Sequence, residues 1–407
     1  ISGVISLKDI TKLGRMGLKT LGLYLITTLF AVTLGLVFVN IIKPGEHQDD
    51  SIRVENRIAY ELWLADNPNV QRVDDLRLLD SPKYAQKTAE VSARLKGEKY
   101  NDWVADKMNK KEGAVNKGPL SALEDVFSSN IFRSLADSKM LQIIFFGIFF
   151  GVVLSMIPKD KAKPVIGIVE GLNEVFIKMV MVIMKAMPFF VFALMAGQIV
   201  KAAGSDPEKF TELMKFYLWY GFVVIFGLVT MAFVVYPLIV KTMAGMGFGK
   251  FLGGVRDAQI TAFSTSSSVA TLPVTMDCLE NKIGASKSTA SFVLPIGATV
   301  NMDGTSLYQA VAVVAMAQFH MIDLSIAQQA IIVGTATLAS IGAAAIPSAG
   351  LVLMMVVLES VGLNPAWIAI IFPIDRILDM CRTVVNVTGD ATVTTIIAKS
   401  EDELKSE

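Results

Sequence analysis

The chain has few cysteines and few histidines, which argues against a disulfide-stabilised fold and against a serine nucleophile activated by histidine. Only Cys278 and Cys381 occur in 407 residues. They are far apart in apolar segments, so they give no disulfide framework. The two histidines, His47 and His320, fall in or beside expected loops, whereas a serine nucleophile needs a base within hydrogen-bonding reach. The formal net charge is zero, and we expect no nucleic-acid partner.

Charge of either sign is also scarce. Charged residues make up 18% of the chain and hydrophobic residues 53%, with a mean hydropathy of +0.54, which is too apolar for one soluble domain. Continuous apolar spans at about 18–42, 139–157, 163–200 and 212–242 each provide the roughly 20 residues that a bilayer core needs. The first residue is Ile1 and no cleavable signal peptide is read there. We expect a multi-pass membrane protein whose chain is truncated at its start.

A polar segment at residues 43–138 separates the first two spans and carries charges of both signs. It cannot lie in lipid, and we interpret it as a solvated loop or small helical insert, with a partner-docking element as the alternative. Lysines and arginines flank the spans at 8–19, 159–163 and 241–250. The positive-inside rule makes these flanks and the C-terminus cytoplasmic in a plasma (inner) membrane, and the insert extracytoplasmic.

Beyond residue 250 the apolar segments are broken by small and polar residues. The breaks are STSSSVATLP (264–273), NMDGT (301–305) and SIGAAAIPSAG (340–350). Broken helices are tolerated at membrane depth only where the backbone is buried in protein or lines a watery cavity. The first and third breaks predict two re-entrant helical hairpins at about 251–285 and 324–361, related as inverted repeats. Taken alone, STSSS would be a loop at the membrane edge. NMDGT predicts an unwound helix over about 288–319, because Asn, Asp and Gly are poor helix formers.

The last helix, about 364–396, carries a polar stripe. At 100° per residue, five polar side chains fall within about 80° of one helix face: Asp375, Asp379, Arg382, Asn386 and Asp390. A charge at bilayer depth costs roughly 2.5 to 3.5 kcal/mol on insertion scales, so such groups usually face a bundle interior, a cavity or a bound ion.

The NMDGT segment predicts an ion site. Unwinding beside Asp303 would free carbonyl oxygens that suit an alkali cation. The alternative is a structural kink with Asp303 paired to an arginine.

Four motifs occur in a fixed order: STSSSVATLP, NMDGTSLYQ, SIGAAAIPSAG and DMCRTVVNVTGD. Together they resemble the glutamate transporter family, the dicarboxylate/amino acid:cation symporters, over nearly the whole chain except about 43–117. The resemblance implies an all-α polytopic membrane protein that forms a homotrimer in the lipid bilayer. It also implies a transport domain that moves like an elevator past a scaffold. The chain begins just before the family's third helix, so we expect the family's first two helices to be absent.

The resemblance divides the chain into functional parts. Residues 1–42 would form the first transmembrane helix, as part of the transport domain, and 43–138 the insert. Residues 139–211 would form scaffold and trimerisation helices, and 212–407 the remainder of the transport domain.

A substrate site for an acidic amino acid is also implied. Arg382 is similar to the arginine that binds the substrate side-chain carboxylate, and a guanidinium fork fits a carboxylate well. Asp379 is similar to the acceptor of the substrate ammonium, and Asp375 to a residue that fixes Arg382. The other implied substrate positions are Ser267, Ser268, Met302, Thr305, Ile346, Gly350, Thr383 and Asn386.

Three sodium sites are implied, and no other cofactor. The first would use Gly297, Asn301, Asn386 and Asp390; the second Thr299, Ser340, Ile341 and Ala343; the third Tyr24, Thr27 and Thr28 with Asn301 and Asp303. Without the resemblance, the three hydroxyls of the first helix would be taken as ordinary helix-packing groups.

Several positions depart from the family pattern. Ser266 and Met380 stand where many relatives carry an arginine. Arg376 lies one turn before Asp379, and we hypothesise that it supplies the missing positive charge. Gln309 stands where proton-coupled relatives carry glutamate. A glutamine cannot titrate, so we predict that sodium drives transport.

The sequence therefore predicts a secondary transporter rather than an enzyme, one that couples sodium to the symport of aspartate or glutamate. The same fold could instead serve C4-dicarboxylates or neutral amino acids. Two alternatives from other classes are an intramembrane hydrolase using Asp303 with Asp390 and an ion channel. A channel would need a ring of groups from several subunits, whereas these polar groups converge from one chain.

Overall fold

A computed structural model describes residues 10–68, 70, 72–97, 130–136, 140–184, 189, 207–341 and 349–405. Within these ranges every regular element is helical, and the only β pairing is an isolated bridge between Ala285 and Leu404. The predicted all-α class is confirmed over this part of the chain.

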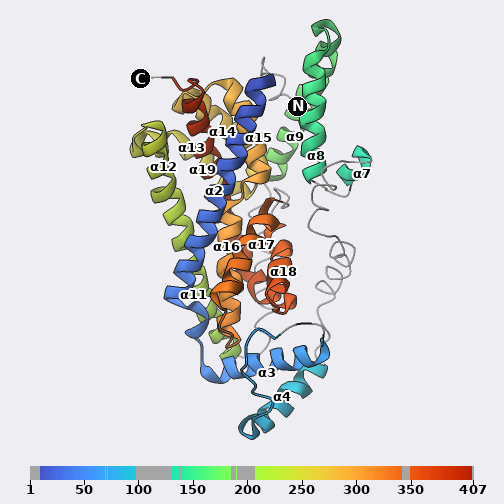
Figure 1. Ribbon diagram of the computed structural model, residues 1–407, viewed down its shortest axis with the longest axis vertical. Helices are drawn as coiled ribbons and strands as arrows, with labels where there is room; N and C mark the ends of the chain where they lie inside the picture. The colour runs from blue at the N-terminus through green and yellow to red at the C-terminus, as the bar shows by residue number, and fades with distance from the viewer. Residues whose placement is uncertain are drawn as a thin grey trace.

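Two long apolar helices run side by side along the bundle (Figure 1). Helix α2 covers Ile10–Ile42, and α11 (Pro207–Thr230) continues through a π-helical turn, Met231–Val235, into α12 (Tyr236–Ala244). In the described residues, two stretches, Gly14–Glu46 and Thr211–Ala244, are long and apolar enough to cross a membrane. They match the first and fourth predicted spans.

The second and third predicted spans are also helical where they are described. Helix α8 covers Met140–Met156 and α9 covers Lys159–Met184. Most of the third span beyond residue 184 lies outside the described residues.

Each predicted break separates two helices. In NMDGT only Asn301 and Met302 leave the helix, and Asp303 already belongs to the next one. The unwinding is thus shorter than NMDGT suggested. The turn of the third break, which includes Ala343 and Ile346, lies outside the described residues. The helix pairs are α13 (Phe248–Thr265) and α14 (Ser268–Asp277), α15 (Lys287–Val300) and α16 (Asp303–Phe319), and α17 (Ile326–Ile341) and α18 (Ala349–Ser360).

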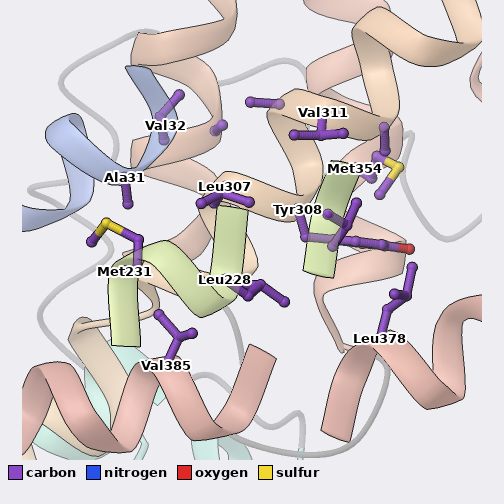
Figure 2. Close-up of a cluster of buried hydrophobic side chains, with 14 of the residues drawn as sticks. Ala31, Val32, Leu228, Met231, Leu307, Tyr308, Val311, Met354, Leu378 and Val385 are labelled. Carbon is purple, nitrogen blue, oxygen red and sulfur yellow. The ribbon is translucent and has the colours of Figure 1, made fainter. Parts of the chain in front are cut away.

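Helix α19, Ile368–Ser400, packs against all of the broken helix pairs. Leu307 of α16 lies in the same buried cluster as residues of α2, α11 and α19 (Figure 2). Apolar burial adds little between helices in lipid, where association depends on close van der Waals packing. Glycines make this packing close: a Cβ atom on Gly35 of α2 or Gly227 of α11 would lie 3.1 Å from the Leu307 side chain.

Two described helices of the insert, α3 (Asp50–Asp66) and α4 (Ala85–Gly97), lie at the end of the bundle opposite the C-terminus, and a third, α7 (Ile131–Ala136), lies apart from them beside α8 (Figure 1). Asp49 caps α3 by accepting a hydrogen bond from the Ser51 amide at 2.8 Å. The described part of the insert is thus largely helical. The charged stretch at 98–113 lies outside the described residues.

Buried Arg57 forms contacts within the insert and with the helix bundle. Its guanidinium contacts Glu61 at 2.9 Å and Asp74 at 2.5 Å, and it donates to the carbonyl oxygen of Met321 at 3.4 Å. Tyr60 donates to the carbonyl oxygen of Gly362 at 3.1 Å. The insert is therefore docked on the ends of α16 and α18 by buried polar contacts.

The C-terminal segment returns to the N-terminal ends of other helices. Glu401 forms ion pairs with Arg15 and with Lys19, the latter at 2.7 Å. Glu403 accepts hydrogen bonds from Ser286, the N-cap of α15, and from Thr289. The start of α2, the start of α15 and the end of α19 are thereby held at one end of the bundle.

Candidate functional site

The polar stripe of α19 is buried inside the bundle. Asp375, Asp379, Arg382, Asn386 and Asp390 are each exposed by 7% or less. This placement agrees with the expectation that such residues avoid lipid and face a protein interior.

Arg382 connects the two carboxylates that precede it on α19. Its Nη2 atom lies 2.5 Å from Asp379 Oδ1 and 3.2 Å from Asp375 Oδ1. The Nε and Nη1 atoms are buried and have no hydrogen-bond partner among the described residues. A buried charged donor is costly to leave unpaired. The guanidinium therefore retains N–H donors, at Nη1 and at Nε, for an incoming acceptor such as a carboxylate oxygen.

Tyr308 of α16 holds this cluster from the opposite side. Its hydroxyl group donates to Asp375 Oδ1 at 2.9 Å. The ring lies under the guanidinium of Arg382, with 4.0 Å between Arg382 Cζ and the ring centroid. This cation–π contact and the Asp375 bond fix the plane of the guanidinium.

Asn386 links the start of α16 to α19. Its Oδ1 atom accepts from the Gly304 amide at 2.8 Å, and its Nδ2 atom lies 3.5 Å from Thr305 Oγ1. Gly304 permits this approach, because a Cβ atom there would lie 2.5 Å from the Arg382 carbonyl oxygen. The first turn of α16 is thus pressed directly against the stripe.

The beginning of α18 lies beside Arg382 and the first turn of α16. A Cβ atom on Gly350 would lie 2.5 Å from Thr305 Cγ2 and 3.4 Å from Arg382 Nη1. Gln309 donates from Nε2 to the Gly350 carbonyl oxygen at 2.8 Å. Of the residues predicted around the substrate, Gly350, Thr305, Arg382 and Asn386 are therefore brought together.

The serines of the first hairpin shape the start of α14. Ser266 ends α13 in the left-handed conformation with φ of 51°, and its buried Oγ has no hydrogen-bond partner in the described part of the chain. Ser267 caps α14 by accepting from the Ala270 amide at 3.2 Å. Ser268, the first residue of α14, is buried. Both α13 and α14 pack on α19.

A second polar cluster surrounds Asp303, which is fully buried. Thr28 of α2 lies 2.6 Å from Oδ1, and the Tyr236 hydroxyl lies 2.6 Å from Oδ2. The π-helical turn at 231–235 ends directly before Tyr236, and such turns often occur where a helix aims a functional side chain. The predicted alternative of an Asp303–arginine pair is wrong, because within the described structure this carboxylate is held by hydroxyl groups.

Asp390 lies beside this cluster. Its Oδ1 accepts from Asn301 Nδ2 at 2.9 Å, and a Cβ atom on Gly297 would lie 2.5 Å from the same oxygen. Tyr24 also approaches Gly297, and its hydroxyl donates to the Val293 carbonyl oxygen at 3.2 Å. The Asn301 Oδ1 atom is buried without a partner in the described residues.

Neither Asp303 nor Asp390 forms an ion pair within the described structure, although both are buried. No group of three or more His, Cys, Asp or Glu residues in that part of the chain could hold a metal ion. A cation here would therefore rely on hydroxyl and amide oxygens together with these two carboxylates. Such hard oxygen ligands suit an alkali cation.

Most of the other predicted site residues that are described form hydrogen bonds only within their own helices. Thr27 donates to the Tyr24 carbonyl oxygen, Thr299 to that of Ile296, Ser340 to that of Thr337, and Thr383 to that of Asp379. Met302 is buried against Leu353. Ile341 ends α17, while Ala343 and Ile346 lie outside the described residues.

Sequence reasoning gave no role to Tyr236 or Tyr308. A tyrosine in the middle of an apolar span is a signal, because tyrosines usually lie at membrane interfaces. That signal could mark Tyr236 as unusual, but it could not identify Asp303 as the partner.

The comparisons with known proteins agree with the motifs. The sodium:dicarboxylate symporter family model matches residues 1–400. Excitatory amino acid transporter 3 of Homo sapiens is 35% identical over 412 residues, covering 100% of this chain and 76% of the relative. Excitatory amino acid transporter 4 of Mus musculus is 33% identical over 417 residues, covering 96% and 72%. An excitatory amino acid transporter of Caenorhabditis elegans is 34% identical over 393 residues, covering 96% and 75%. On this evidence the chain belongs to the sodium:dicarboxylate symporter family.

Proposed function

We propose that this protein is a membrane transporter that couples sodium to the symport of an acidic amino acid, aspartate or glutamate. The observation that carries the substrate class is the buried Arg382 guanidinium, with two unpartnered donors in the described structure and Asp379 beside it. The relatives' names, excitatory amino acid transporters, support the same class.

In this proposal Arg382 binds the substrate side-chain carboxylate and Asp379 accepts the ammonium group. Asp375 and Tyr308 orient Arg382. Thr305, Thr383, Asn386 and Met302, with backbone groups at Ser267, Ser268, Ile346 and Gly350, would surround the amino-acid backbone. The juxtaposition of Gly350, Thr305 and Arg382 supports this arrangement.

Sodium would bind at the Asp303 and Asp390 clusters. Two buried carboxylates without an ion pair in the described residues favour a bound cation. Asn301 Oδ1, buried without a described partner, is an available ligand beside Asp390. Tyr24, Thr27 and Thr28 would complete one site and Gly297 another. Thr299, Ser340, Ile341 and Ala343 would form a further site.

Coupling follows from the start of α16, where Asp303 lies in a proposed sodium site and Thr305, two residues later, lies in the proposed substrate site. Sodium beside Asp303 and Asp390 would fix the break between α15 and α16, and the first turn of α16 carries Gly304 and Thr305 against Asn386. Ion binding would thereby prepare the substrate site. Linkage then requires that substrate raise sodium affinity by the same factor.

We also propose that α13–α14 and α17–α18 are re-entrant hairpins of an inverted repeat. Both pairs share a helix–break–helix pattern, and they lie in opposite halves of the bundle (Figure 1). Helices α3 and α4 of the insert lie at the end opposite the C-terminus (Figure 1), which supports an extracytoplasmic insert and a cytoplasmic C-terminus. A homotrimer with an elevator motion, using residues 139–211 as scaffold, is part of the same proposal.

Uptake into proteoliposomes tests this function. Radiolabelled aspartate should accumulate when an inward sodium gradient is imposed, and proton or potassium gradients alone should not drive it. Arg382→Cys should abolish aspartate uptake, because the anchor for the side-chain carboxylate is lost, while Arg256→Gln at an exposed site should behave as wild type. Aspartate uptake that survives in Arg382→Cys would refute the assignment.

A further inference from the structure

A cavity lies between the insert and the ends of α17 and α18, outside the proposed substrate and sodium sites. Its volume is about 570 Å³, within the roughly 300 to 1,000 Å³ that is typical of small-molecule sites. One wall comes from the end of α3 and the chain that follows it, and the other from α17, α18 and the turn after α18. Apolar side chains line both walls, among them Trp63, Val73, Ile331 and Leu363.

Two hydrogen bonds join these walls. Gln328 of α17 donates from Nε2 to the Val73 carbonyl oxygen at 3.2 Å, and Tyr60 of α3 donates to the Gly362 carbonyl oxygen at 3.1 Å. Gln328, Val73 and Gly362 all line the cavity. The insert and the α17–α18 pair thus meet at the edge of the cavity, and a ligand inside it would contact both.

The cavity also presents charges of both signs. Arg72 of the insert and Glu359 near the end of α18 are exposed and line the same cavity. Arg72 offers a guanidinium fork that suits a carboxylate. A carboxylate accepts several hydrogen bonds, so Glu359 can take a ligand ammonium group in addition to its existing interaction. The complementary ligand is a zwitterion with a large apolar group, because Trp63 and Ile331 line the same space.

Helix α18 connects this cavity with the proposed substrate site. Glu359 and Ser360, at its end, line the cavity. Near its start, a Cβ atom on Gly350 would lie 3.4 Å from Arg382 Nη1. The helix has 12 residues, so its two ends are roughly 15 Å apart along the axis. A ligand that holds the end of α18 to the insert would therefore also hold its start beside Arg382.

We propose that this cavity is a second, allosteric site that binds a zwitterionic amino acid with a large apolar side chain. Arg72 binds the carboxylate of this ligand, Glu359 binds its ammonium group, and the apolar side chain lies against Trp63. The bound ligand holds α18 to the insert, which slows the release of aspartate from the substrate site. Each ligand then raises the affinity for the other by the same factor. This effect on aspartate rests on the proposed function, whereas binding in the cavity does not.

L-tryptophan and two analogues that each lack one charge test the site. Calorimetric titrations use the purified protein with saturating sodium and L-aspartate, so that the substrate site is already filled. We expect L-tryptophan to bind. Tryptamine lacks the carboxylate and indole-3-propionate lacks the ammonium group. Each analogue should bind at least about fivefold more weakly than L-tryptophan, because it loses one charged contact.

Two substitutions separate the charged contacts. Arg72→Gln should weaken L-tryptophan and indole-3-propionate by about fivefold and leave tryptamine unchanged. Glu359→Gln should weaken L-tryptophan and tryptamine and leave indole-3-propionate unchanged. Arg77→Gln, at an exposed arginine that does not line the cavity, should behave as wild type. All three variants should bind L-aspartate in sodium alone as wild type does, which shows that they are folded.

The release of radiolabelled L-aspartate tests the coupling along α18. Saturating L-tryptophan should slow release from the wild type several-fold. At an L-tryptophan concentration near its wild-type Kd, the slowing should be largely lost in Arg72→Gln and retained in Arg77→Gln.

Three kinds of result overturn the inference and leave the proposed function intact. A wild type that binds no L-tryptophan, or an analogue that binds as tightly as L-tryptophan, contradicts the zwitterion site. L-tryptophan binding that neither Arg72→Gln nor Glu359→Gln weakens places its site elsewhere. Aspartate release that is unchanged at saturating L-tryptophan contradicts the coupling. A wild type that binds no aspartate in sodium overturns the proposed function instead, and L-tryptophan binding then still decides whether the cavity is a site.

Discussion

At the scale of single residues, the candidate sodium site depends on the hydrogen-bond partners of individual carboxylate oxygens. Asp303 illustrates the point, because its two oxygens meet hydroxyl groups from α2 and α12, helices that are far apart in the sequence. Asp303 could be identified from the sequence, since a charge in an apolar segment stands out, whereas Thr28 became a candidate only through the family resemblance. Sequence reasoning could not find Tyr236, whose role depends on how a π-helical turn aims one side chain across the bundle.

Thr28→Val tests the hydroxyl cluster at the residue scale. Valine keeps the shape of threonine but removes one oxygen 2.6 Å from Asp303. A hydrogen bond to a charged group contributes roughly 1.5 to 3 kcal/mol, so the apparent sodium affinity should fall about tenfold or more. The sodium concentration for half-maximal aspartate binding is the quantity to measure.

Thr33→Val is the matched control on the same helix. Thr33 is exposed and donates only to the Leu29 carbonyl oxygen of its own helix. It should leave the sodium dependence unchanged. An unchanged sodium dependence in Thr28→Val would remove Thr28 from the ion site.

Helices and their breaks were the most predictable level of this structure. Apolar runs bounded by poor helix formers predicted the ranges covered by α11 to α19 within a few residues, whereas α2 begins at Ile10, well before the predicted start at about 18. The docking of the insert could not be predicted, because a charged segment with both signs looks solvated until its partners are known. Arg57 of this segment is buried and paired and is not solvated. Burial alone lowers the pKa of its guanidinium, but the hydrogen bonds with Asp74 and Glu61 outweigh burial and raise that pKa.

Arg57→Met should release the insert from the bundle. The substitution leaves Glu61 buried, with the amides of Leu78 and Leu79 but without its guanidinium. Removing one partner of a buried ion pair costs about 3 to 5 kcal/mol. Thermal unfolding in detergent should show a clear drop in Tm. Arg77→Met, at an exposed arginine 3.8 Å from Asp80, should not, and equal Tm values for the two variants would contradict this role for Arg57.

The C-terminal contact predicts a pH dependence. The hydrogen bond from Arg15 lowers the pKa of the Glu401 carboxyl, and Lys19 lowers it further. Burial raises this pKa, but by less, so the pKa lies below its ordinary value of 4.5. The contact therefore stabilises the fold above that pH and is lost as the pH falls below it. Because Arg15 is largely exposed, the contribution is about 1 kcal/mol or less.

Glu401→Gln tests this at two pH values. The variant should unfold at a lower temperature than wild type at neutral pH, and the difference should shrink as the pH falls below 4.5. Asp402→Asn, at the adjacent exposed residue, should show no such pH-dependent gap. A gap that stays constant with pH would show that the Glu401 charge does not stabilise the contact.

At the scale of the whole molecule, two buried clusters meet across one broken helix. The ion cluster gathers α2, α12, α15, α19 and the first residue of α16, and the substrate cluster gathers α16, α18 and α19. The two clusters meet at the start of α16, where Asp303 belongs to the ion cluster and Thr305 to the substrate cluster. Motifs could predict that both clusters exist. The resemblance already assigned Asn386 to both, and the structure adds its contacts with the Gly304 amide and with Thr305 Oγ1.

Calorimetric titration of L-aspartate at stepped sodium concentrations tests the central claim, that sodium prepares the substrate site. Choline replaces sodium to hold the ionic strength constant. Aspartate affinity should rise steeply with sodium, and sodium affinity should rise by the same factor when aspartate is present. An aspartate affinity that is the same in sodium and in choline would contradict this claim.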